Sequence, residues 1–284
     1  MHSRTSRFFR VFAICGLSAA TAVCGLPRSS AGEPSQDPDR AQAEQLKRVL
    51  IVTGEDYPGH KWKETTPVLK RQIAGDRRLA VEVVEDLTFL RSPKLHDYDT
   101  VVAHFKNYDP QVPGREGFDN LARFVREGGG LVLVHFACGA FQEFKDDFTK
   151  LAGRAWNPKL RGHDPRGKFR VEIVDPDHPV TRGLEPFETT DELYTCLEGE
   201  PAIHVLADAK SKVDGKRYPM AFVLCYGKGR VLHCVLGHDV AAFEVPAVGE
   251  LFRRAAAWTA GLEPAAAPEP DGSREKGEGE KGGT

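Results

Sequence analysis

A stretch near the middle of the chain constrains the fold more than any other. Three glycines, Gly128–Gly130, are followed by four consecutive apolar residues, Leu131–Val134. Glycines permit a tight turn, and an apolar run of this length is typical of a strand that is buried on both faces. The run ends at His135, and the segment Phe141–Phe148 then places phenylalanines at helical spacing. The pattern therefore predicts a buried parallel strand, a sharp turn and a helix.

Comparable strand and helix patterns alternate along much of the chain. Strands are predicted over 49–53, 79–84 and 100–105, and amphipathic helices over 63–73 and 118–125. Such alternation is typical of a parallel sheet with helices on both faces. Further strands are expected over 169–174, 205–207, 220–224 and 230–236, with a closing helix over 248–258. The predicted fold is an α/β three-layer αβα sandwich with a mostly parallel sheet.

The charge balance narrows the class of partner. The chain has 284 residues, of which 40% are apolar, so it is long enough to bury one large core. Its 39 Lys and Arg residues and 41 Asp and Glu residues leave a formal net charge of −2. A nearly neutral chain lacks the basic field that draws proteins to nucleic acids or anionic membranes. We therefore expect a small-molecule ligand, with no nucleic acid and no membrane bound by the mature protein.

The N-terminal residues have the pattern of an export signal. Arginines without any acid occupy residues 1–10, and the apolar run 11–20 is too short to span a bilayer. Small residues at Ser29–Ala31 predict cleavage after Ala31, with lipidation at Cys24 or a retained anchor as the alternatives. We thus expect a periplasmic or secreted protein with a signal peptide at 1–31, a polar linker at 32–47, one domain at 48–262 and a disordered tail at 263–284.

Four cysteines remain after the predicted cleavage, and we do not expect them to form a disulfide framework in so large a domain. A hairpin turn centred on Lys228 would set Cys225 and Cys234 about three residues out of register, which is roughly 10 Å at ~3.3 Å per residue. That separation exceeds the ~7 Å limit for a disulfide. No disulfide is therefore predicted between these two residues.

Three histidines, His60, His135 and His238, each follow a different predicted strand. Because the carboxyl ends of parallel strands meet at one edge of a sheet, we expect these side chains to share a site. Imidazole is the commonest metal ligand in proteins, and together with a carboxylate such a cluster suits one divalent ion such as Zn²⁺. Alternatively, His135 and His238 act as general acid and base, with Glu192 or Asp191 as their partner.

Further residues are candidates for substrate binding. The irregular, polar stretch 155–168 contains Trp156, Arg161 and His163, and Tyr194 lies two residues after the acidic pair. Polar loops of this length often carry function, and aromatic rings can stack on the apolar face of a sugar. Each of these residues also has a purely structural alternative as a packing, capping or turn residue.

Six motifs follow one another in a characteristic order: Val49–Gly54, His60, Gly128–His135, Arg161–Asp164, Asp191–Tyr194 and Gly237–Asp239. Together they resemble the ThuA-like family, which is named for trehalose utilisation, over roughly residues 48–262. The resemblance implies a flavodoxin-like fold of the class I glutamine amidotransferase type, and a role in the uptake or oxidative breakdown of disaccharides through 3-keto intermediates.

One position departs from the amidotransferase pattern. In that fold the nucleophilic cysteine occupies the turn after the central strand, where the helix N-terminus stabilises its thiolate. Here His135 takes the turn, and Cys138 comes three residues later. We therefore do not expect glutamine hydrolysis by a cysteine–histidine pair.

These observations lead to two hypotheses about function. The first is an exported hydrolase or lyase that acts on a disaccharide or a 3-keto-glycoside, either by histidine-based acid–base chemistry or with the help of a metal. The second is a noncatalytic carbohydrate-binding module on the same scaffold, because a fold does not prove an activity.

Overall fold

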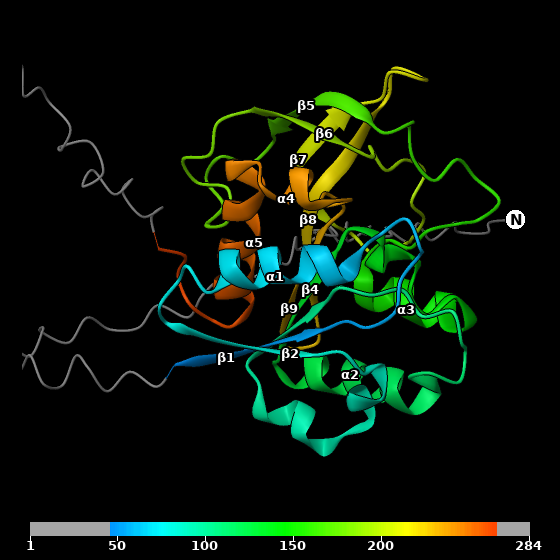
Figure 1. Ribbon diagram of the computed structural model, residues 1–284, viewed down its shortest axis with the longest axis vertical. Coiled ribbons are helices and arrows are strands. Elements are labelled where there is room, and N and C mark those ends of the chain that lie inside the picture. Colours follow the sequence, from blue (N-terminus) through cyan, green and yellow to red (C-terminus); the bar gives the residue numbers. More distant parts are fainter. Residues whose placement is uncertain (1–45, 266–284) are drawn as a thin grey trace, which may run out of the picture. The chain divides into compact units, whose positions relative to one another are not determined.

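The computed structural model describes residues 46–265, which form a sheet flanked by helices (Figure 1). The sheet has nine strands in the order β2-β1-β3-β4-β9-β8-β7-β5-β6. The first five strands in this order are β2 (Leu79–Val84), β1 (Lys47–Val52), β3 (Thr100–Ala103), β4 (Gly130–Val134) and β9 (Gly229–Cys234). The other four are β8 (Arg217–Tyr226), β7 (His204–Lys210), β5 (Gly167–Ile173) and β6 (Phe187–Asp191).

The prediction of a mostly parallel sheet is wrong. Strands β2, β1, β3, β4 and β9 pair in parallel, whereas β9–β8, β8–β7, β7–β5 and β5–β6 are all antiparallel. Half of the pairings are therefore antiparallel, and the sheet is mixed. The physical reason lies in the connections: β8 and β9 are joined by a two-residue turn, which only antiparallel strands permit, and no helix follows β5, β6 or β7 to carry a parallel crossover.

Helices pack on both faces of the parallel half. The first face is covered by α1 (Trp62–Ile73) and α5 (Pro246–Thr259), whose buried side chains join those of β1 and β4 in one apolar cluster. The second face is covered by α2 (Gly114–Glu127) and α3 (Lys145–Ala152), which share a second cluster with the alternate residues of the same strands. In Figure 1, α1 lies above β1 and β2, and α2 lies below them.

The glycines at the start of β4 are required by the backbone and by close packing. Gly128 ends α2 with φ +128°, a conformation that side chains rarely permit. A Cβ added at Gly130 would lie 2.4 Å from the carbonyl oxygen of Thr259, so α5 could not pack so close to the strand. All five residues of β4 are buried, as predicted for the central strand.

The turn after β4 is tighter than the sequence indicates. His135 has φ +49°, a left-handed conformation that is uncommon outside glycine. His135 is the first residue of a short 3₁₀ turn, His135–Gly139, and Phe141 is again left-handed at φ +51°. The α-helix therefore begins only at Lys145, whereas helical spacing predicted a start at Phe141.

The hairpin between β8 and β9 decides the cysteine prediction. Cys225 pairs with Arg230, and Cys234 pairs with Ala221, so the predicted register was wrong by one residue. The two cysteines are farther out of register than predicted. Cys234 is a free, buried thiol, which confirms that no disulfide joins it to Cys225.

Within residues 46–265, no helix is both long enough and apolar enough to cross a bilayer. The predicted signal peptide and almost all of the predicted linker and tail lie outside the described residues.

Candidate metal centre

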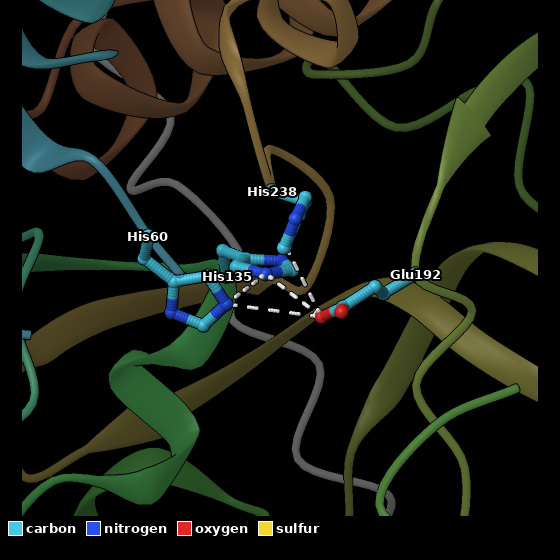
Figure 2. Close-up of side chains that lie close together, drawn as sticks. All are labelled: His60, His135, Glu192 and His238. Atoms are coloured by element: carbon cyan, nitrogen blue, oxygen red, sulfur yellow. Dashed lines mark hydrogen bonds and ion pairs between the residues drawn. The ribbon is translucent and has the colours of Figure 1, made fainter. Parts of the chain in front are cut away.

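Four side chains from distant parts of the chain converge at the carboxyl edge of the sheet (Figure 2). His60 lies in the loop after β1, His135 directly follows β4, and His238 lies in the loop after β9. These three strands belong to the parallel set, so their carboxyl ends point the same way. Glu192 is the fourth member and follows β6. One ligand atom from each of the four residues lies within 4.8 Å of the others.

Asp191 links Glu192 to the histidine-bearing loop. Its carboxylate is fully buried and accepts hydrogen bonds from the backbone N–H groups of Gly237 at 2.7 Å and His238 at 3.2 Å. It also accepts one from the N–H of Glu192 at 2.8 Å. Asp191 therefore holds the ends of β6 and β9 in a fixed relation. Asp191 thus contacts the backbone of the loop after β9, whereas Glu192 faces the three imidazoles (Figure 2).

Two of the imidazoles are oriented by outer hydrogen bonds. His135 Nδ1 lies 2.8 Å from the carbonyl oxygen of Val235, which can only accept, so Nδ1 carries a proton. His60 Nδ1 lies 3.0 Å from Oδ1 of Asp56, and the same argument places a proton there. In the neutral rings the Nε2 atoms then carry lone pairs. Outer hydrogen bonds of this kind fix the tautomer and the orientation of metal-binding histidines.

The ring nitrogens that face the centre of the cluster have no hydrogen-bond donor opposite them within residues 46–265. These atoms are Nε2 of His60, Nε2 of His135 and Nδ1 of His238. The two Nε2 atoms of His60 and His135 lie 3.2 Å apart, so two lone pairs face one another unless a proton or a cation lies between them. His238 Nδ1 is buried, has no hydrogen-bond partner within the described part of the chain, and lies 3.3 Å from Oε2 of Glu192. The same oxygen lies 3.5 Å from His135 Nε2 and 3.8 Å from His60 Nε2. A central cation would satisfy all four groups.

In the absence of a metal, protons on the histidines supply the positive charge between the imidazoles and the Glu192 carboxylate. Burial lowers the pKa of His60, but hydrogen bonds to the carboxylates of Asp56 and Glu192 outweigh it and raise the pKa to about 9. Burial raises the pKa of Glu192, but the close contacts with the imidazoles of His135, His238 and His60 bring that pKa well below its usual range. The cluster therefore holds a carboxylate that stays ionised and attracts positive charge.

The donor set suits a divalent metal ion. Three imidazole nitrogens and one carboxylate oxygen are a combination typical of zinc sites, and the carboxylate also suits related divalent ions. His60 and His135 are almost fully buried, whereas the side chains of Glu192 and His238 are 13% and 16% exposed. All four side chains are therefore largely buried, and Glu192 and His238 are the more exposed pair.

The predicted substrate-binding residues lie at different distances from this cluster. His163 is close: its Nε2 lies 3.7 Å from Oε1 of Glu192, and its Nδ1 donates to the carbonyl of Asp164 at 2.7 Å. The ring of Tyr194 packs 5.0 Å from that of His135 but is only 2% exposed.

Trp156 and Arg161 are engaged mainly with other groups. Trp156 packs 5.5 Å from the ring of Phe136. The guanidinium of Arg161 pairs with Asp214 at 2.9 Å and donates to Thr195 at 3.2 Å. Their role in substrate binding stays a prediction.

Two further buried side chains near the sheet, Cys138 and His104, do not join the cluster. Cys138 is fully buried, and burial raises the pKa of its thiol well above the usual value, so the thiolate that a nucleophile needs is disfavoured. His104, which also follows a strand, bonds to the hydroxyls of Thr65 and Thr66, and burial lowers its pKa to about 4.

Sequence reasoning gave no role to Asp56, the outer partner of His60. Asp56 and His60 are four residues apart and enclose Tyr57, Pro58 and Gly59, which form a turn that returns the chain on itself. An acid placed four residues before a candidate ligand, across a Pro-Gly turn, was the available signal.

Comparisons with known proteins agree with the fold. A sequence model of the ThuA family, described as trehalose utilisation, matches residues 48–259. A ThuA-like protein from Parabacteroides merdae superimposes with a TM-score of 0.68 at 24% identity, covering 79% of this chain and 94% of that one. One from Bacteroides uniformis gives 0.62 at 19% identity, with coverages of 80% and 95%. No curated protein sequence shows significant similarity to this chain.

Proposed function

Because this chain belongs to the ThuA family, whose description points to a carbohydrate-related role, we propose that it is an exported, metal-dependent hydrolase or lyase. Its substrate would be a disaccharide or a 3-keto-glycoside. Export is proposed from the arginine-containing start and short apolar run of residues 1–20. The metal centre would be formed by His60, His135, His238 and Glu192.

A single observation carries the metal proposal. Four potential ligand atoms from four separate segments lie within 4.8 Å of one another, and the inner nitrogen of His238 is buried, with Glu192 Oε2 at 3.3 Å but no hydrogen bond within residues 46–265. Buried polar groups without partners are destabilising, so they are normally satisfied by a ligand or an ion.

Each residue of the centre has a definite task in this proposal. The three imidazoles and the Glu192 carboxylate would hold the ion, with Asp56 and the carbonyl of Val235 fixing the tautomers of His60 and His135. A divalent ion supplies Lewis acidity, which polarises a carbonyl group or lowers the pKa of water.

The substrate would meet the more open side of the centre. His163 is half-exposed beside Glu192 and can donate to or accept from a sugar hydroxyl. The reaction is either hydrolysis of the glycosidic bond or removal of the proton next to the keto group. Asp191 is a positioning residue, since all three of its hydrogen bonds go to backbone N–H groups.

The test combines metal content with turnover. Protein purified without chelators is examined by elemental analysis, and turnover of 3-keto-trehalose is measured before and after chelation and after return of Zn²⁺. We expect close to one ion per chain and a loss of activity of ~10²-fold or more on its removal, the scale of an essential catalytic group.

Two variants and one control locate the ion. His238→Gln and His135→Asn each remove one imidazole; asparagine is chosen at 135 because it tolerates the left-handed backbone there. His204→Gln removes an exposed imidazole that pairs with Asp175, away from the cluster. Both cluster variants should lose the ion and the activity, and the control should keep both.

Other outcomes would decide between the remaining readings. Full turnover by metal-free protein would refute the metal centre and favour acid–base catalysis by the histidines themselves. Binding of the keto sugar without turnover would favour the noncatalytic carbohydrate-binding module.

A further inference from the structure

Lys106 is a buried cation that the metal centre does not use. It lies three residues beyond β3, and β3 lies between β1 and β4, the strands that lead to His60 and His135. The residue is 8% exposed. Its loop therefore emerges at the same edge of the sheet as the two histidines.

The ammonium group of Lys106 has few partners. Its Nζ lies 3.4 Å from the ring centre of Tyr108, 5.9 Å from that of Phe136, and 3.3 Å from the carbonyl oxygen of Asn107. Within residues 46–265, no carboxylate lies within ion-pair distance of it. An ammonium has three protons to donate; within residues 46–265 only the carbonyl of Asn107 accepts one of them, and the ring of Tyr108 is its other close contact.

The acids around Lys106 are each engaged elsewhere. Glu55 accepts from the backbone N–H of Tyr108, Asp56 holds His60, and Glu143 accepts from the side-chain amide of Asn107. Burial lowers the pKa of Lys106, partly opposed by the charges of these three acids. Burying a charge without an ion pair is costly, and the three nearby acids offset only part of this cost.

Phe136 connects Lys106 with the metal centre. It directly follows His135, and its ring packs 5.2 Å from that of His60 while also lying near the ammonium of Lys106. Two exposed rings lie beside these groups: Tyr108 against Lys106, and Tyr57, which packs 5.6 Å from the ring of His60. A sugar has an apolar ring face and several hydroxyl oxygens. Exposed aromatic rings can pack against the first, and hydrogen-bond donors beside them can bind the second.

We propose that Lys106 is a substrate-positioning residue that donates hydrogen bonds to oxygen atoms of an uncharged sugar, while Tyr108 and Tyr57 pack against the sugar's apolar face. The inference rests on the proposed function and specifies its substrate class as a neutral glycoside. We expect a neutral rather than a phosphorylated sugar, because the negative charges of Asp56, Glu55 and Glu143 act on the same region as the ammonium group and would oppose a phosphate there.

The experiment measures sugar binding separately from metal binding. Lys106→Met keeps the length and apolar stem of the side chain but removes the donors, Lys106→Arg restores a cation, and Lys150→Met is the control at an exposed lysine of α3. For each zinc-loaded protein, calorimetry records the affinity for trehalose, 3-keto-trehalose and trehalose 6-phosphate. Zinc content and melting temperature are measured in parallel.

We expect Lys106→Met to bind the better of the two neutral sugars about 10- to 100-fold more weakly, the range for a lost charge-assisted hydrogen bond. Its zinc content should equal that of the wild type, and its melting temperature should not fall, because an unpaired buried charge has been removed. Lys106→Arg should recover part of the affinity, and trehalose 6-phosphate should bind more weakly than trehalose.

Three results would overturn the proposal. Unchanged sugar affinity with a lowered melting temperature in Lys106→Met would make the lysine a structural residue while leaving the proposed function intact. If trehalose 6-phosphate bound most tightly of the three sugars, the ligand of Lys106 would be an anionic sugar and not a neutral one. A zinc-loaded wild type that binds none of the three sugars would refute both the carbohydrate role and the role of Lys106, but not the metal centre.

Discussion

Replacing Asp56 by asparagine tests the outer support of the metal centre with a change of one atom. The Asp56 carboxylate accepts the Nδ1 proton of His60 at 3.0 Å, and both side chains are largely buried, at 5% and 9% exposure. Asparagine removes the negative charge. It can also turn its NH₂ group toward Nδ1, which would move the proton to Nε2, the atom that faces the other ligands.

The expected loss follows from this geometry. Outer partners of metal-binding histidines typically contribute 10- to 100-fold in affinity, which corresponds to about 1.4–2.7 kcal/mol. We expect Asp56→Asn near the upper end, because the hydrogen bond is charge-assisted, is shielded from water and controls the tautomer. Competition of the protein with a chromophoric chelator for Zn²⁺ gives the affinity of each variant.

Asp175→Asn is the matched control. Asp175 pairs with His204 at 2.6 Å, the same two residue types in contact, but away from the cluster. The Asp175→Asn variant should bind zinc as tightly as the wild type. Equal affinities in the two variants, or an Asp56→Asn protein that binds zinc as tightly as the wild type, would refute the argument that Asp56 orients a ligand.

Four further predictions concern the pH dependence of stability and of zinc affinity, the core, and processing. In metal-free protein the pKa of His60 is about 9, against 6.5 for an unperturbed histidine. Protonated His60 therefore contributes fully to the stability of the fold below pH 6.5, and this contribution is lost as the pH rises through 9. Thermal melts of chelated protein should show the loss. Zinc affinity should rise over the same interval, because the ion displaces that proton, and calorimetry in two buffers should detect its release. Leu131→Ala in β4 should lower the free energy of unfolding by about 2–5 kcal/mol with zinc content unchanged, as measured by urea denaturation. Protein from the native cell envelope should begin near Gly32 by intact mass, and a retained Met1 would contradict the export signal.

The parallel half of the sheet was largely predictable from the sequence. The apolar runs of β1 and β4 are long enough to indicate buried strands, and helices between them favour parallel pairing. From that alone, His60, His135 and His238 were expected at one edge, and the structure places them there. A position at the carboxyl end of a parallel strand is thus a good predictor of which side chains share a site.

The antiparallel half was not predictable in the same way. Segments such as Phe187–Asp191 are short and alternate between buried and exposed residues, a pattern that sets which face is buried but not the direction of pairing. The position of Glu192 follows from those pairings. The sequence also could not say which of two adjacent acids faces the cluster, because this depends on Asp191 meeting the backbone of Gly237 and His238, 46 and 47 residues later.

The four residues of the cluster are spread along the chain from position 60 to position 238. A chain folding from its N-terminus lacks one member until β9 has joined β4 and the following loop has formed, because His238 comes last. Long-range contacts of this kind form late and slowly. Full occupancy by an ion would therefore indicate that β9 has joined the sheet, and a fragment ending before β9 would lack one of the four ligands.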